Sequence, residues 1–262
     1  MDIAVCVKRV PLTQEVDLEI NAGKKDIRKD MLAYAINEWD NYAVEEAIRV
    51  KEKFGGNVTA VTVGKEDDEE VLRRCLAMGA DRAIRVDPED LSMDSFVIAK
   101  ILSAVIKGMP HDFVLTGVQA DDTNEGAVGV MLAENLALPH AAVVRGLETQ
   151  GNEATVRVEL EGGTDEVSKV KLPALISIQS GINEPRYVSI MGIRKVAKKE
   201  IKVLGVKDLP LMANETGLSG SDTRIEKISF PGTTGAVKMI EGNPEEVALN
   251  VLNVLKEKGG LA

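Results

Sequence analysis

The sequence predicts an α/β fold in which a mostly parallel sheet carries helices on both faces. Between Ile3 and Val144, short apolar runs alternate with segments whose apolar residues recur at helical spacing. The apolar runs are nearly continuous, which is typical of strands buried on both faces of a sheet. This alternation indicates βαβ units, whose strands are parallel and whose helices cover the sheet.

The elements of this region follow one another with clear boundary signals. Strands are expected at residues 3–7, 58–63, 83–86, 113–116 and 141–144. Helices are expected around residues 43–50, 66–79, 97–105 and 128–136. The first helix follows a segment that ends at Asp40, and the second has Gly79 near its end, as C-capping favours. Asp94 or Ser95 caps the third helix.

The pattern changes after about Leu147. Residues 154–160 and 167–172 flank a glycine-containing turn and predict a β-hairpin, and 174–178 predicts a further sheet strand. From Asn183 the sequence is rich in Gly, Ser and Thr, and a last helix is expected to start near Pro244. This tail has too few apolar residues for a core of its own, so it is expected to pack on the domain or on a partner. We therefore expect an α/β domain at 1–190 and an extended C-terminal arm at 191–262.

Composition and charge narrow the function classes. The net charge of −10 argues against a general nucleic-acid binder, because phosphate affinity comes from Lys and Arg. No apolar run approaches the roughly 20 residues of a membrane span, and the N-terminus lacks the features of a secretory signal. Cys6 and Cys75 each lie in an apolar stretch, which favours a reducing compartment over a disulfide scaffold. The chain is expected to be cytoplasmic, without membrane insertion.

The segment 117–129 is the most informative candidate site. Ligands of parallel α/β sheets bind beyond the carboxyl ends of the strands, yet both the dinucleotide glycine fingerprint and the P-loop are absent. Gly126 and Gly129 allow a ligand to approach the backbone, and the following helix start attracts phosphate. Asp121 and Asp122 are potential acceptors for ribose hydroxyls. On these residues alone, nucleotide binding and an ordinary polar loop with a helix cap are equally supported.

Catalytic and metal chemistry find little support in the sequence. His111 and His140 are the only histidines, and neither has ligand spacing with the cysteines. A nucleophile elbow is absent, and Cys6 is expected to be a core residue. We therefore expect no catalytic residue and no metal site.

Several sequence blocks resemble the beta subunits of electron-transferring flavoproteins. The signature region is matched by Leu172-Pro173-Ala174-Leu175-Ile176-Ser177, by Asn183-Glu184-Pro185-Arg186-Tyr187 and by the basic stretch that ends at Lys199. Further agreement comes from residues 6–11, 43–47, 77–82, 220–223 and 241–246. The resemblance covers nearly the whole chain in the right order.

The resemblance implies a Rossmann-like fold of the adenine nucleotide alpha hydrolase type and a two-subunit electron carrier. The partner alpha subunit holds most of an electron-carrying FAD, and the beta subunit reaches around it with its C-terminal tail. The beta subunit binds a structural AMP in many members and a second FAD in a flavin-bifurcating branch. By position, the nucleotide contacts are Val7, Lys8, Asn37, Asp40, Thr62, Val63, Gly64, Asp122, Glu125, Gly126, Ala127 and Val128.

Two blocks favour FAD over AMP in the beta site. Asp40, in Asn37-Glu38-Trp39-Asp40, and the pair Val128-Gly129 resemble the bifurcating branch. The loop 122–125 departs from that branch, which usually has Asp-Gly-Asp-Thr there, and it does not match the AMP type either. An acidic Glu125 beside a phosphate is unfavourable unless its side chain points away.

The resemblance also implies a docking loop for dehydrogenases, acyl-CoA dehydrogenases among them. An aliphatic anchor follows the Tyr of the signature block, and Ile190 occupies that position. Internal packing of Ile190 is equally compatible with the sequence. Arg194 and Lys195 belong to a basic cluster that the resemblance makes a candidate surface for an acidic partner, although a solvated face explains the charges alone.

Two other function classes remain as alternatives. A stand-alone ATP- or AMP-binding protein of the universal-stress type shares the fold, but it is expected to end soon after the fifth strand. A hydrolase or ligase acting on an adenylate needs catalytic residues beside a glycine-rich loop, and the sequence offers none. The electron-carrier subunit, which is not itself an enzyme, is the favoured function.

Overall fold

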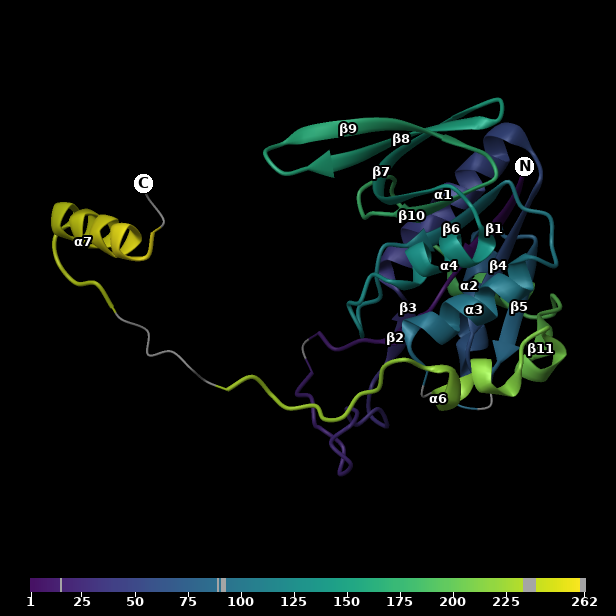
Figure 1. Ribbon diagram of the computed structural model, residues 1–262, viewed down its shortest axis with the longest axis horizontal. Helices are drawn as coiled ribbons and strands as arrows, with labels where there is room; N and C mark the ends of the chain where they lie inside the picture. The colour runs from purple at the N-terminus through teal and green to yellow at the C-terminus, as the bar shows by residue number, and fades with distance from the viewer. Residues whose placement is uncertain (15, 89, 91–92, 233–238, 260–262) are drawn as a thin grey trace. The chain divides into compact units, whose positions relative to one another are not determined.

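The central feature of the computed structural model is one large sheet (Figure 1). The structure describes residues 1–14, 16–88, 90, 93–232 and 239–259. Within these residues nine strands pair in the order β11-β5-β4-β1-β6-β10-β7-β8-β9. They are β1 (Asp2–Cys6), β4 (Asn57–Val63), β5 (Arg82–Asp87), β6 (Phe113–Gly117), β7 (His140–Gln150), β8 (Glu153–Leu160), β9 (Thr164–Lys171), β10 (Ala174–Ile178) and β11 (Lys202–Gly205). Neighbours from β11 to β7 are parallel and β7-β8-β9 are antiparallel, which confirms the predicted fold class and hairpin.

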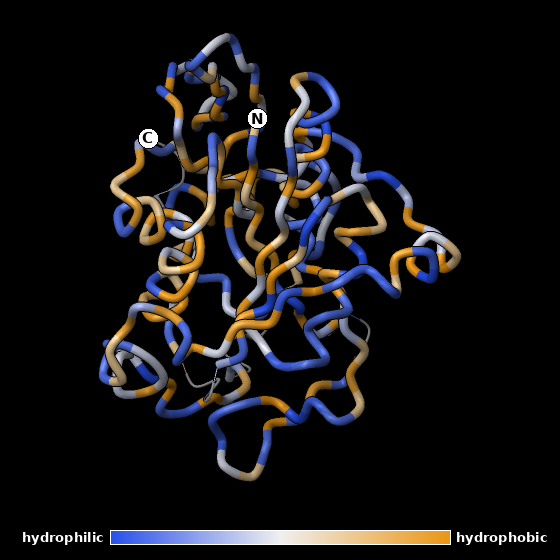
Figure 2. The backbone as a smooth tube through the Cα atoms, turned by 90° about the vertical axis from the view of Figure 1, so that its right-hand side faces the viewer, coloured by the Kyte–Doolittle hydropathy of each residue, from blue (hydrophilic) through white to orange (hydrophobic). Residues whose placement is uncertain are grey.

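The helices cover the sheet on both faces, as the sequence predicts. They are α1 (Glu38–Phe54), α2 (Glu69–Met78), α3 (Ser95–Ile106) and α4 (Val128–Leu136), with a short 3₁₀ turn, η1 (Glu66–Asp68), before α2. Ile3 and Val5 of β1 pack in one core cluster with α1 and α2, while Ala4 and Cys6 pack in a second cluster with α3 and α4. Successive strand residues thus face opposite layers, so both faces of β1 are apolar. Figure 2 shows hydrophobic stretches running through the middle of the view and mainly hydrophilic residues in the outer loops.

Two short strand regions were not predicted from the sequence. The pair β2 (Arg9–Pro11) and β3 (Tyr34–Ile36) forms a small antiparallel sheet, and β11 lies parallel to β5 at the edge of the main sheet. Each has only three or four residues, too few to show a periodic pattern. Val206, just after β11, is buried in the second core cluster. This part of the tail therefore packs on the domain itself.

The remaining elements after β10 are short, apart from the last helix. They are α5 (Ile190–Val196), η2 (Val206–Asp208), η3 (Ala213–Glu215), α6 (Gly217–Gly220) and α7 (Pro244–Glu257). The predicted start of α7 is confirmed, since Asn243 and Glu246 form a capping box and Pro244 is the first helical residue. Two compact units comprise Met1–Lys227 and Ile228–Ala262. The division at residue 190 concerns partner contacts and stays a prediction. Across the described ranges, none of the helices has the length and apolarity that a membrane crossing requires.

Candidate functional site

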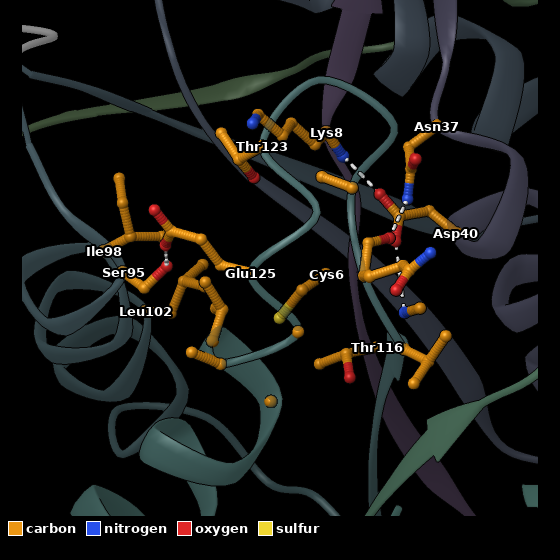
Figure 3. Close-up of a pocket in the computed structure, with 18 of the residues that line it drawn as sticks. Cys6, Lys8, Asn37, Asp40, Ser95, Ile98, Leu102, Thr116, Thr123 and Glu125 are labelled. Atoms are coloured by element: carbon orange, nitrogen blue, oxygen red, sulfur yellow. Dashed lines mark hydrogen bonds between the residues drawn. The ribbon is translucent and has the colours of Figure 1, made fainter. Parts of the chain in front are cut away.

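A pocket lies beyond the carboxyl ends of β1, β4 and β6 (Figure 3). The chain passes from β1 outward through β4 to β5 and then returns to the other side of β1 for β6. Such reversals of strand order open a crevice, and they are where α/β sheets bind ligands. The cavity has a volume of about 180 Å³. A single water needs only about 10–15 Å³ by this measure, so the space is a ligand-sized pocket and not a packing defect.

The start of α1 places a buried carboxylate in the pocket wall. Asp40 was predicted to precede the first helix, but the helix begins at Glu38 and Asp40 lies in its first turn. Asp40 is 6% exposed and accepts backbone N–H bonds from Lys8 (2.8 Å) and Gly117 (3.1 Å). Burial raises the pKa of Asp40 to about 7. Hydrogen bonds from Asn37, Lys8 and Gly117 lower the pKa, but their effect is smaller than that of burial. A Cβ at Gly117 would lie 2.4 Å from Asp40 Oδ1, so the site requires glycine there.

Asn37 joins three segments of the site. It is fully buried at the N-cap of α1, where its backbone N–H donates to Lys8 O at 2.9 Å. Its side chain donates to Gln119 O at 2.7 Å and accepts from the N–H of Asp121 at 3.0 Å. The loop after β6 is therefore fixed to the end of β1 and to the start of α1.

The N-terminus of α4 offers donors for an anion. The N-cap residue, Ala127, has no capping side chain, so it leaves first-turn N–H groups without a side-chain partner. Thr116 Oγ1 is buried and has no hydrogen-bond partner in the described part of the protein. A Cβ at Gly129 would lie 2.8 Å from this hydroxyl, so glycine keeps the space beside it open. A buried hydroxyl without a partner next to free N–H groups fits a phosphate-bearing ligand.

The structure gathers most of the predicted nucleotide contacts but not all. Those that line the pocket are Val7, Lys8, Asn37, Asp40, Val63, Glu125, Gly126, Ala127 and Val128. Thr62 lies outside it and donates its hydroxyl to Val7 O at 2.8 Å. Gly64 also lies outside, with its N–H bonded to Val86 O and its carbonyl to Arg85. Asp122 is at the rim, where its carboxylate contacts Lys8 Nζ at 2.5 Å.

The pocket wall formed by the start of α3 was not predicted from the sequence. Met93, Asp94, Ser95, Ile98 and Leu102 line the pocket from this side. The capping signal of Asp94 was read correctly, because its side chain accepts from the N–H of Val97 at 3.1 Å. Its place in the pocket depends on the order of the strands, which no local signal gives.

Cys6 lies in the pocket wall, but its environment does not favour reactivity. The thiol is 7% exposed, and burial, followed by the negative charge of Asp40, raises its pKa. A protonated thiol is a poor nucleophile and a poor metal ligand. Within the described ranges, no group of three or more His, Cys, Asp or Glu side chains is placed to hold a metal ion.

The predicted docking residues lie at the surface on α5. Ile190 is 71% exposed, so the alternative of internal packing is wrong, and Met191 and Tyr187 are exposed beside it. Arg194 and Lys195 are also exposed. The preceding Arg186 supports this segment through ion pairs with the buried Glu45 at 2.9 Å and with Glu52 at 2.9 Å. Asn183 donates to Glu46 at 2.9 Å, which adds a second attachment to α1.

Comparisons with known proteins agree with this architecture. The electron transfer flavoprotein domain matches residues 29–209. The chain is 39% identical over 265 residues to the electron transfer flavoprotein subunit beta of Methylophilus methylotrophus, covering 99% of this chain and 100% of that protein. It is 37% identical to the subunit of the same name from Bacillus subtilis, with 98% of each covered. It is 33% identical to the caffeyl-CoA reductase-Etf complex subunit CarD of Acetobacterium woodii, covering 98% and 99%. The chain therefore belongs to the electron transfer flavoprotein beta-subunit family.

Proposed function

We propose that this chain pairs with an electron transfer flavoprotein alpha subunit in the cytoplasm and binds a phosphate-bearing adenine nucleotide in the pocket. The observation that carries this proposal is the buried Thr116 hydroxyl without a partner, beside the uncapped start of α4. The pocket lies at the reversal of strand order, where this fold binds nucleotides. Residues 1–190 form the nucleotide-binding domain in this proposal, and 191–262 provide the docking loop and an arm that packs on the alpha subunit.

The nucleotide that we propose is FAD, in preference to AMP. The segment 37–40 and the pair Val128-Gly129 support it through their resemblance to the bifurcating branch. The 33% identity to a subunit of a reductase–Etf complex is consistent with this assignment. A bound flavin supplies the electron-carrying ring, and the protein's part is to hold it and to tune its environment. Asn37 and Asp40 fix the walls of the pocket, and Thr116 and the α4 N–H groups face the anion. Two flavins per heterodimer would permit electron bifurcation.

The chain would exchange electrons with a dehydrogenase, of the acyl-CoA class or another, that docks on α5. Ile190 provides an exposed aliphatic side chain, and Arg194 and Lys195 provide positive charge beside it. An exposed apolar anchor surrounded by charge is typical of a transient interface.

Nucleotide content tests the proposal directly. The chain is co-expressed with the alpha subunit, the complex is purified and denatured, and the released nucleotides are quantified. About two FAD without AMP supports the flavin assignment, whereas about one FAD with one AMP supports a simple shuttle with a structural nucleotide. Absence of any nucleotide attributable to the beta subunit contradicts the proposal.

A pair of variants localises the nucleotide. Gly129→Val places a larger side chain beside Thr116 and should abolish the beta-subunit nucleotide. Ile190→Ala, on the exposed face of α5, should leave the content unchanged. A stand-alone universal-stress protein is not favoured, because full-length relatives are electron transfer flavoprotein subunits.

A further inference from the structure

The charged side chains that line the pocket are predominantly acidic. Among the residues that the structure describes, they are Lys8, Asp40, Asp94 and Glu125. Sites that bind extended phosphate chains usually surround them with cations and N–H donors. In this pocket, the lining thus includes one ammonium group and three carboxyl groups.

Lys8, the single cation that lines the pocket among the described residues, already has a counter-ion. Lys8 Nζ lies 2.5 Å from Asp122 Oδ1, and the two side chains are 43% and 26% exposed. A ligand phosphate that uses Lys8 must therefore compete with the Asp122 carboxylate. This competition reduces the contribution of Lys8 to the binding affinity of the pocket for any anion.

The carboxylate of Glu125 lies near the starts of two helices, α3 and α4. Glu125 accepts a hydrogen bond from the hydroxyl of Ser95, the first residue of α3 (Figure 3). In sequence it lies three positions before Val128, where α4 begins. Helix N-termini attract negative charge, so Glu125 takes part of the attraction that a phosphate would use.

We propose that Asp122 and Glu125 determine the specificity of the pocket by selecting against nucleotides with free di- or triphosphate chains. This inference rests on the proposed function, because it concerns the same nucleotide site. Each further phosphate adds negative charge close to carboxylates that are already there. A nucleoside monophosphate carries less negative charge than ADP or ATP, and so does a dinucleotide whose pyrophosphate is esterified at both ends. The pocket therefore accepts these two classes and rejects ADP and ATP.

Calorimetric titration of the full-length chain in its purified, nucleotide-depleted complex tests this selectivity. AMP, ADP and ATP are compared at one ionic strength, with and without Mg²⁺. Affinity should fall in that order, and AMP should bind at least roughly tenfold more tightly than ATP. Equal affinities would overturn the inference. Tighter binding of Mg²⁺-ATP than of AMP would also overturn it, because the carboxylates would then hold a metal–phosphate complex.

Charge-removing variants test the two residues. Glu125→Gln keeps an acceptor for Ser95, and Asp122→Asn keeps the size of the side chain. Each should reduce the preference for AMP over ATP by about fivefold, the upper range for a partly exposed charge pair. Glu161→Gln is the matched control, since its exposed carboxylate lies in the turn between β8 and β9 and does not line the pocket. It should leave the preference unchanged.

The outcomes separate this inference from the proposed function. If AMP binds but both variants behave like Glu161→Gln, the specificity role is wrong while the nucleotide site stands. If neither AMP nor the released-nucleotide assay shows a ligand, the nucleotide site itself is wrong.

Discussion

The pocket and the docking segment on α5 are built in opposite ways. The pocket is held by side chains that are almost fully buried, such as Asn37 and Asp40, and these bond to backbone groups of distant segments. The docking segment presents Tyr187, Ile190 and Met191 to solvent, and its anchors lie below it on α1. Changes in the pocket should therefore alter stability and nucleotide content, whereas changes on α5 should alter only partner binding.

The largest expected effect is the pH dependence contributed by Asp40. Burial raises its pKa to about 7, above the value of about 3.9 for an exposed Asp. The folded state therefore holds this proton more tightly, and the stabilisation present at low pH is lost as pH rises from about 4 through 7. Asp40→Asn removes the titration. Relative to the wild type, the unfolding free energy of this variant should rise by roughly 3 kcal/mol over this pH range. The altered hydrogen bond adds an offset that is the same at every pH.

Urea denaturation at several pH values measures this difference. Gly232→Ala, which removes no titratable group, serves as the control and should give a curve parallel to the wild type. Parallel curves for Asp40→Asn as well would show that the carboxylate does not carry a raised pKa.

Gly117→Ala should be the next most harmful change. The added Cβ would lie 2.4 Å from Asp40 Oδ1 and 2.8 Å from the Asp40 backbone N. Because Asp40 lies in the first turn of α1, moving its backbone away costs free energy. A loss of about 2 kcal/mol in unfolding free energy is expected from this overpacking. Gly232→Ala, where an added Cβ meets nothing within 4 Å, should be nearly neutral in the same denaturation assay. Equal stability of the two variants would mean that the pocket wall is less rigid than we infer.

Asp94→Ala tests the wall formed by the start of α3. Asp94 caps this helix, and its other oxygen accepts from the N–H groups of Asp222 and Thr223 at 2.8 and 2.9 Å. Loss of a cap costs about 1 kcal/mol. Hydrogen exchange at Asp222 and Thr223 should also become faster. Unchanged exchange would contradict a role of Asp94 in attaching the tail to the pocket rim.

Ile190→Ala should have the smallest effect on stability and a selective effect on docking. A side chain that is 71% exposed contributes little to the core, so the unfolding free energy should change by less than about 0.5 kcal/mol. Electron transfer to the partner dehydrogenase should show a higher KM at an unchanged nucleotide content. Val167→Ala, at a 60% exposed aliphatic residue of β9, is a control for general surface changes. A destabilised Ile190→Ala variant would remove the contrast between the two regions.

Local sequence signals predicted the regular elements well. The strands and helices between Ile3 and Leu136 and the β8–β9 hairpin lie close to the expected positions. Asp94 caps α3 as expected, because capping depends on a few neighbouring residues. The short strands β2, β3 and β11 were missed, since three or four residues carry too little periodicity to be recognised. The helical position of Asp40 was missed because the apolar residues at helical spacing begin only at Ala43.

The sequence by itself determined the fold class, the family resemblance and most of the pocket, since each depends on patterns along the chain. Only the tertiary structure decided that α3 forms a pocket wall, that Thr62 and Gly64 lie outside the pocket and hydrogen-bond to other backbone groups, and that Ile190 is exposed. Burial, pKa and ligand access depend on which strands are neighbours. Strand order brings together residues such as Lys8 and Asp122 that are far apart in sequence, and no local pattern encodes their contact.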